Sequence, residues 1–275
     1  MLDDGDNFGY MHDLATRLLI WADGDKSQPF PEATILRIGP SSIALIPDAD
    51  PDCVVKVVTL KRNPIPEGLQ VEREFGILQK LYPAKDDLYV TPKPLAWGTD
   101  PSFIVMERLG PKFDMTKLNE TDVENIGRSL GAFSADIWEK YGSIHSDICI
   151  GNYTKEPNGK IGIIDIASVI KEQHPENMLC VPLLQKPNIS PYLADEFEKR
   201  SGVRIRIELA TSMMQTRLAG FLAHHPPETA ERIQNDVASN LEEWRALTES
   251  GRLSSHRPSP RARQRNAPVR LSLKT

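Results

Sequence analysis

The chain has 275 residues, of which 40% are hydrophobic and 26% charged, the ordinary composition of a globular protein. It contains no run of 18 apolar residues, and its acidic first residues lack the apolar stretch of a secretory signal, so we expect neither a membrane span nor a secretory leader. Three scattered cysteines (Cys53, Cys149 and Cys180) do not make a disulfide framework or a zinc site. We therefore expect a reducing, cytoplasmic compartment, and delivery into a host cell stays open.

The net charge of −5 conceals a basic C-terminal segment. Residues 251–275 hold six Arg, one Lys and no acid, and they are rich in Ser and Pro, which predicts a disordered tail. Because this tail contributes +7, the remaining 250 residues carry −12. The tail could contact nucleic acid, an acidic partner or anionic lipid, or it could simply be solvated.

The first part of the chain predicts a helix followed by short strands. Residues 1–32 are expected to form an N-terminal helical extension, in which a short amphipathic helix ends before Asp23 and carries Leu14, Leu18, Leu19 and Trp21. Three β-rich runs follow, separated by turn-forming residues, at 33–39, 42–47 and 53–60. This spacing predicts an antiparallel meander.

A helix is predicted next, over residues 66–82, and then two more strands, at 88–98 and 102–110. Pro92 and Pro94 limit ladder hydrogen bonds, so the first of these strands should be short or lie at an edge. Residues 33–110 therefore predict an antiparallel sheet with one inserted helix.

The rest of the chain is mostly helical. A helix is expected over residues 121–142, with Thr121 and Glu124 as its capping box, and further helices are expected near 190–200, 203–223 and 226–249. A sheet-rich part (33–110) followed by a helical part (111–250) predicts an α+β, bilobal fold with a hinge near 109–112.

Four polar residues stand at fixed offsets in the middle of the chain. His145, Asp147 and Asn152 follow the pattern His-x-Asp-x4-Asn, and the apolar run that starts at Ile161 ends on Asp165. A carboxylate and an amide at element ends offer hard oxygen ligands for Mg²⁺, which makes Asp165 and Asn152 candidate metal ligands. Asp147 could orient or deprotonate a hydroxyl.

Lys56 lies within the valine-rich run CVVKVV. One interpretation is an edge strand with Lys56 on its wet face. The alternative is a buried ammonium, which needs an acidic partner, and Glu72 or Glu74 of the following helix could supply it.

Taken in chain order, these residues resemble the protein-kinase-like superfamily over about 33–170. The order is a lysine on the third strand, a glutamate on the next helix, the His-x-Asp-x4-Asn loop, and an aspartate 18 residues after Asp147. The resemblance implies a kinase-like fold, with an antiparallel N-lobe sheet, an αC-type helix and a mostly helical C-lobe. VEREFGILQKL resembles the αC helix, which favours Glu74 over Glu72 as the partner of Lys56.

The resemblance also implies roles for individual residues. Lys56 and Glu74 would position the phosphates of ATP, Asp147 would be catalytic, and Asn152 and Asp165 would hold Mg²⁺. FIVMERLG resembles the fifth strand and hinge, so Met106 would sit behind the adenine while the backbone of Glu107 and Leu109 bonds its edge. Gly39 and Ser41 belong to a reduced glycine-rich loop over the phosphates.

The chain departs from that family in ways that bear on function. Ser146 stands between His145 and Asp147 where an Arg is common, the Asp-Phe-Gly motif reads Asp165-Ile166-Ala167, and no activation loop is evident. These features are more similar to RIO kinases and aminoglycoside-type phosphotransferases. We therefore expect an ATP-dependent kinase acting on a protein Ser/Thr hydroxyl, with a small-molecule kinase or a nucleotide-binding pseudokinase scaffold as alternatives.

Overall fold

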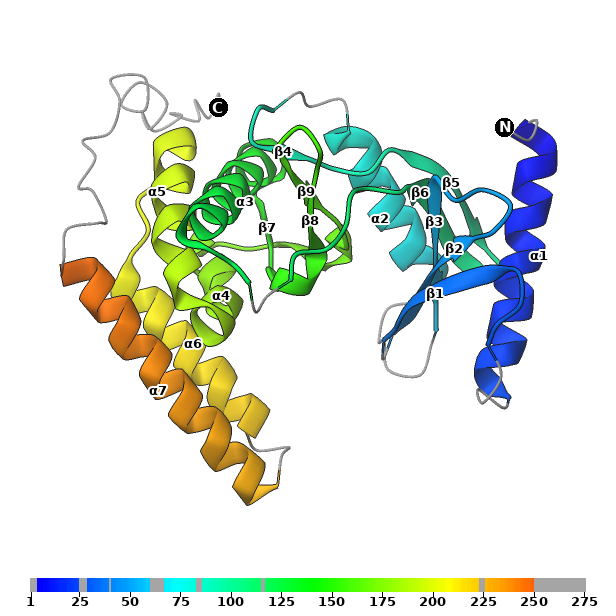
Figure 1. Cartoon of the computed structure of the whole chain (residues 1–275). Helices are drawn as coiled ribbons and strands as arrows, with labels where there is room; N and C mark the ends of the chain where they lie inside the picture. The colour runs from blue at the N-terminus through cyan, green and yellow to red at the C-terminus, as the bar shows by residue number, and fades with distance from the viewer. Residues whose placement is uncertain are drawn as a thin grey trace, which may run out of the picture. The chain divides into compact units, whose positions relative to one another are not determined.

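The computed structural model describes residues 4–24, 29–39, 41–59, 67–82, 86–114, 117–222 and 226–249, so the basic tail lies outside the described residues. The predicted α+β class is confirmed. The chain divides into two compact units (Figure 1). Unit 1 comprises Met1–Asp86, Val90–Pro111 and Gly162–Ala167, and unit 2 comprises Asp87–Tyr89, Lys112–Ile161 and Ser168–Thr275.

Unit 1 is built on a five-stranded antiparallel sheet with the strand order β1-β2-β3-β6-β5. The strands are β1 (Ala33–Ile38), β2 (Ser42–Pro47), β3 (Cys53–Val58), β5 (Pro94–Thr99) and β6 (Ser102–Glu107). The first three form the predicted meander, and β5 lies at an edge of the sheet, where its proline costs no ladder bond on one side. The run expected to be one strand at 88–98 is in fact two, β4 (Tyr89–Val90) and β5, because the chain leaves the extended ladder around Pro92.

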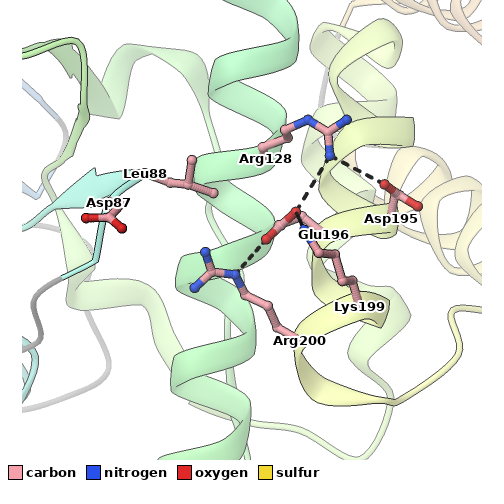
Figure 2. A pocket seen from close by; sticks show the side chains of 7 residues that line it. All are labelled: Asp87, Leu88, Arg128, Asp195, Glu196, Lys199 and Arg200. Carbon is pink, nitrogen blue, oxygen red and sulfur yellow. Dashed lines mark hydrogen bonds and ion pairs between the residues drawn. The ribbon is translucent and has the colours of Figure 1, made fainter. Parts of the chain in front are cut away.

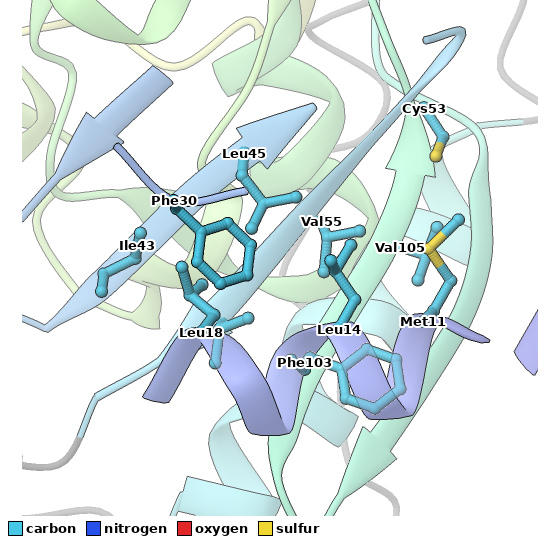
Figure 3. Close-up of a cluster of buried hydrophobic side chains, with 12 residues drawn as sticks. Met11, Leu14, Leu18, Phe30, Ile43, Leu45, Cys53, Val55, Phe103 and Val105 are labelled. Atoms are coloured by element: carbon cyan, nitrogen blue, oxygen red, sulfur yellow. The ribbon is translucent and has the colours of Figure 1, made fainter. Parts of the chain in front are cut away.

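Two helices pack on this sheet. Helix α1 (Asp4–Asp23) is much longer than the short helix expected before Asp23, and it buries Met11, Leu14 and Leu18 against the sheet (Figure 3). Helix α2 (Glu67–Leu81) contacts β5 and β6, where Phe75 lies against Trp97 with ring centroids 6.1 Å apart.

The alternation of side chains along β3 assigns its two faces. Cys53, Val55 and Val57 belong to the apolar cluster under α1, together with Leu45 and Val105 from the neighbouring strands (Figure 3). Because successive side chains of a strand point to opposite faces, Val54 and Lys56 face the α2 side. The interpretation of Lys56 as an edge residue on a wet face is wrong: β3 is an interior strand and Lys56 is 7% exposed.

Unit 2 is mostly helical. Its helices are α3 (Glu120–Tyr141), α4 (Cys180–Gln185), α5 (Ser190–Ser201), α6 (Ile207–Leu222) and α7 (Pro227–Glu249). Its short strands are β7 (Ser143–His145), β8 (Tyr153–Lys155) and β10 (Val169–Lys171), and β9 (Ile161–Ile163) lies where the chain passes into unit 1. Strand β10 pairs antiparallel with β7.

The start of α3 corrects one expectation. The capping box is formed by Asn119 and Asp122, whose side chains each accept a hydrogen bond from the other's backbone N–H, and not by Thr121 and Glu124. Asn is as good an N-cap as Thr, and the same three-residue spacing occurs two positions earlier.

Helices α3 and α5 pack closely through two glycines. An added Cβ at Gly127 would lie 2.8 Å from the carbonyl oxygen of Ile189, and one at Gly131 would lie 2.5 Å from that of Leu193. Helix α3, which precedes the His145–Asn152 loop, therefore packs against α5 in direct backbone contact. A residue larger than glycine at either position would prevent this contact.

Candidate functional site

Lys56 joins two carboxylates in unit 1. Its Nζ donates to both carboxylate oxygens of Glu74 on α2, at 2.9 and 3.0 Å, and to Oδ1 of Asp165 at 2.6 Å. Glu72, the other candidate partner, is exposed. Residues that are 18 and 109 positions apart from Lys56 in the chain thus meet at one ammonium.

Burial and charge act against each other in this cluster. Burial alone would lower the pKa of Lys56, but the charges of Glu74 and Asp165 outweigh it and the pKa is raised. Burial raises the pKa of Glu74; Lys56 lowers it, Asp165 raises it, and the net direction is upward. One ammonium between two carboxylates leaves a net charge of −1, so a further cation beside Asp165 would be stabilised.

The backbone of Asp165 adopts a left-handed conformation with φ of 61°. Only Gly, and less often Asn or Asp, adopts this region without a large cost, and such outliers concentrate at functional sites. The carboxylate is 33% exposed, so it remains accessible to a ligand while Lys56 holds one of its oxygens.

The residues expected around an adenine lie on β6 and just after it. Met106 is buried and pairs with Val54, so it shares the sheet face of Lys56. The N–H of Glu107 donates to the carbonyl of Lys93 at 2.9 Å, which leaves the Glu107 carbonyl and the Leu109 N–H as the backbone groups that could bond an adenine edge.

Two backbone groups of the β1–β2 turn already have hydrogen-bond partners in the protein. The N–H of Gly39 donates to the carbonyl of Ser42 at 2.8 Å, and the carbonyl of Ser41 accepts from Thr59 at 2.8 Å. Pro40, which lies outside the described residues, has no N–H. The turn therefore offers less backbone to an anion than a glycine-rich loop would.

In unit 2, His145 anchors the loop that carries Asp147. It is buried on β7, pairs with Val169 of β10, and stands edge-on to Phe133 of α3, with ring centroids 6.1 Å apart. The loop then turns tightly, because the N–H of Cys149 donates to the Asp147 carbonyl at 2.8 Å. Asp147 itself is half-buried, so its carboxylate can reach a ligand from a fixed backbone.

Asn152 ends this loop and is 1% exposed. Its Nδ2 donates weakly to the Asp147 carbonyl at 3.4 Å, while its Oδ1 has no hydrogen-bond partner within the described part of the chain. A buried amide oxygen without a donor is costly, and a hard cation is a ligand that would satisfy it. The donor type at Asn152 thus fits a magnesium ligand.

The predicted residues fall into two groups, one in each unit. Unit 1 brings together Lys56, Glu74 and Asp165, and unit 2 brings together Asp147 and Asn152. One residue that the sequence did not single out, Arg37, shares a cross-strand row with Lys56. The only sign in the sequence is a charged residue inside a β-rich run, and its significance depends on the strand register.

A charged pocket in unit 2 shares no residue with these groups (Figure 2). It is lined by Asp87, Leu88, Arg128, Asp195, Glu196, Lys199 and Arg200. Its cations are held by acids: Nη1 of Arg128 lies 3.5 Å from Asp195, and Nε of Arg200 lies 2.7 Å from the buried Glu196. Because its positive and negative charges are equal in number, we interpret this ion-pair network as a structural link between α3 and α5.

No protein-family model and no curated protein matches the chain. Among solved structures, it is similar to one titled "The complex structure of Rv3197-erythromycin from Mycobacterium tuberculosis", with 15% identity and a TM-score of 0.39 over 86% of this chain and 83% of that chain. A similarity of this size says nothing about shared chemistry. In the described residues, no helix is long and apolar enough to cross a membrane, and no group of three or more His, Cys, Asp or Glu is arranged to hold a metal ion.

Proposed function

We propose that the chain is an ATP-dependent phosphotransferase that moves the γ-phosphate of Mg-ATP to a hydroxyl group. The observation that carries the proposal is the buried Lys56 ammonium, which is bonded to Glu74 and Asp165 on the same sheet face as Met106. A lysine fixed by a buried glutamate is preorganised to meet phosphate oxygens, because its position is set before the ligand arrives.

The proposal gives each residue one task. Lys56, oriented by Glu74, binds phosphate oxygens, and Asp147 accepts or orients the proton of the acceptor hydroxyl. Asp165 in unit 1 and Asn152 in unit 2 each offer an oxygen ligand that would hold Mg²⁺, and the ion would supply positive charge to offset that of the phosphates. Two observations support this assignment. The buried Oδ1 of Asn152 has no hydrogen-bond partner among the described residues, and Lys56, Glu74 and Asp165 together carry a net charge of −1.

A protein Ser/Thr hydroxyl is the first candidate acceptor. A small-molecule hydroxyl is the second, and a specific observation favours it. The 3₁₀ helix Pro175–Leu179, soon after Asp165, is fully buried, so this segment is not a long exposed loop of the kind that protein kinases use to dock protein substrates.

Transfer of labelled γ-phosphate from Mg-ATP to a panel of protein and aminoglycoside acceptors tests the proposal. The wild-type chain should label at least one acceptor class, and Asp147→Asn should lower the rate by about 100-fold or more. Asp236→Asn, at an exposed position of α7, is the matched control and should leave the rate unchanged.

Each other outcome has a defined meaning. A melting temperature raised by Mg-ATP without transfer to any acceptor would indicate the scaffold alternative instead of an enzyme. A wild-type protein that neither binds nor turns over Mg-ATP contradicts the proposal.

A further inference from the structure

Strand register places a second cation in line with Lys56. Arg37 of β1 pairs with Ala44 of β2, and Ala44 pairs with Lys56 of β3. Directly opposed residues of antiparallel strands carry their side chains on the same face of the sheet. Arg37 and Lys56 therefore share the α2-side face, and Ala44 adds only a methyl group between them.

A β-bulge produces this arrangement. The register shifts between Ile35, which pairs with Leu45, and Arg37, which pairs with Ala44, so Leu36 is an extra residue in β1. Ile35 packs with the apolar cluster under α1. Without the bulge, alternation would put Arg37 on that same apolar side; the bulge turns it to the face of Lys56.

The side chain of Arg37 lies at the β1–β2 turn and is available to a ligand. Its Nε is 3.8 Å from the point where a Cβ on Gly39 would sit, and the residue is exposed. No acidic side chain in the described ranges lies within ion-pair distance of its guanidinium, whereas Arg17, another exposed arginine of unit 1, pairs with Glu32 at 2.6 Å. Among the residues that the structure describes, no neighbouring carboxylate thus neutralises the charge of Arg37.

At two positions of the same turn, no backbone N–H is free to bind phosphate. The Gly39 N–H is bonded to Ser42, and Pro40 has none. A guanidinium offers five N–H donors in a planar fork that matches phosphate oxygens. Two strand spacings separate the backbones of Arg37 and Lys56, about 10 Å, which two long side chains can close around one polyphosphate.

We propose that Arg37 is a phosphate ligand that works beside Lys56, so that the β1–β2 turn binds the polyphosphate of a nucleotide through a guanidinium instead of through backbone N–H groups. This inference rests on the proposed function, because it takes the Lys56 face as the nucleotide side. It adds a binding residue in unit 1 and specifies that the ligand carries at least two linked phosphates.

Calorimetric titration of the full chain with Mg-ATP, Mg-ADP, adenosine and inorganic tripolyphosphate tests the inference. Arg37→Gln should weaken Mg-ATP binding by about 10-fold or more, the size of one lost charge-assisted contact. Adenosine binding should stay the same, since adenosine has no phosphate. Arg37→Lys should recover part of the loss, because it keeps the charge but not the planar fork.

Arg232→Gln is the matched control, since it removes the same charge from an exposed position of α7 in unit 2, and its Mg-ATP affinity should remain within about twofold of wild type. Melting temperatures without ligand confirm that each variant is folded. Equal Mg-ATP affinity of wild type and a folded Arg37→Gln protein would overturn the role of Arg37 and leave the proposed function standing.

The tripolyphosphate arm separates the two ideas. If the protein binds tripolyphosphate in an Arg37-dependent way but binds neither adenosine nor ATP, Arg37 and Lys56 bind phosphate together. That result would overturn the nucleotide proposal. Binding of neither Mg-ATP nor tripolyphosphate by wild type would overturn both.

Discussion

The Nζ atom of Lys56 lies 2.6 Å from Oδ1 of Asp165, although 109 positions separate the two residues in the chain. Glu74 binds the same ammonium from helix α2. Three charged groups, from β3, from α2 and from the segment just after β9, thus form one cluster within unit 1. The electrostatic free energy of each group depends on the other two.

Lys56→Met should destabilise the protein by about 3–5 kcal/mol, because it leaves the Glu74 carboxylate buried without a counter-ion. The double variant Lys56→Met/Glu74→Gln should recover most of that loss, since the buried charge is gone. Urea unfolding at neutral pH measures both. Lys93→Met, at an exposed position of unit 1, serves as the control and should cost under about 0.5 kcal/mol. A single variant as stable as wild type would show that the ion pair is not buried in solution.

The stability of Lys56→Met should also depend on pH in a defined direction. Burial and Asp165 both raise the pKa of Glu74, and the variant removes the opposing effect of Lys56. A carboxyl whose folded pKa exceeds its ordinary 4.5 binds its proton more tightly when folded, so its contribution is present at low pH and is lost as pH rises through the folded pKa. Relative to wild type, the free energy of unfolding should therefore fall as pH rises above about 4.5. In Lys56→Met/Glu74→Gln, the free energy of unfolding should not show this additional decrease with pH. If the double variant still shows it, the decrease comes from a group other than Glu74.

Gly131→Ala should destabilise unit 2 by about 1–3 kcal/mol, because its Cβ would lie 2.5 Å from the Leu193 carbonyl oxygen and 2.8 Å from the Glu196 Cβ. Gly76→Ala in α2 is the matched control: nothing lies within 4 Å of its Cβ, so the higher helix propensity of Ala should raise stability by up to about 1 kcal/mol. Thermal unfolding of both variants gives the comparison. Equal effects at the two positions would contradict the close packing of α3 on α5.

Local chemistry made much of the fold predictable. Turn residues separated the runs that became β1, β2 and β3, and the prolines near 92–94 correctly placed β5 at an edge. The length of α1 was not predictable from a few leucines, because its first turns are polar and their order depends on the sheet beneath. Helix α4 was missed because its six residues include a proline and show no helical period.

The candidate site was predictable only residue by residue. Lys56 and Asp165 could be recognised in the sequence because a charged group within or at the end of an apolar run needs a specific reason. Asp147 could be recognised from the His-x-Asp-x4-Asn pattern. The left-handed backbone of Asp165 could not be predicted from the sequence, since φ is set by tertiary context. The sheet face on which Arg37 lies could not be predicted either. One extra residue in β1 reverses the alternation on which a strand prediction depends.

Calorimetric titration of Mg-ATP into wild type and into Lys56→Met/Glu74→Gln tests the central claim most directly, because the double variant removes the ion pair without leaving a buried charge. The account predicts saturable binding to wild type and at least about 10-fold weaker binding to the folded double variant. Binding of equal strength in the two proteins would contradict it.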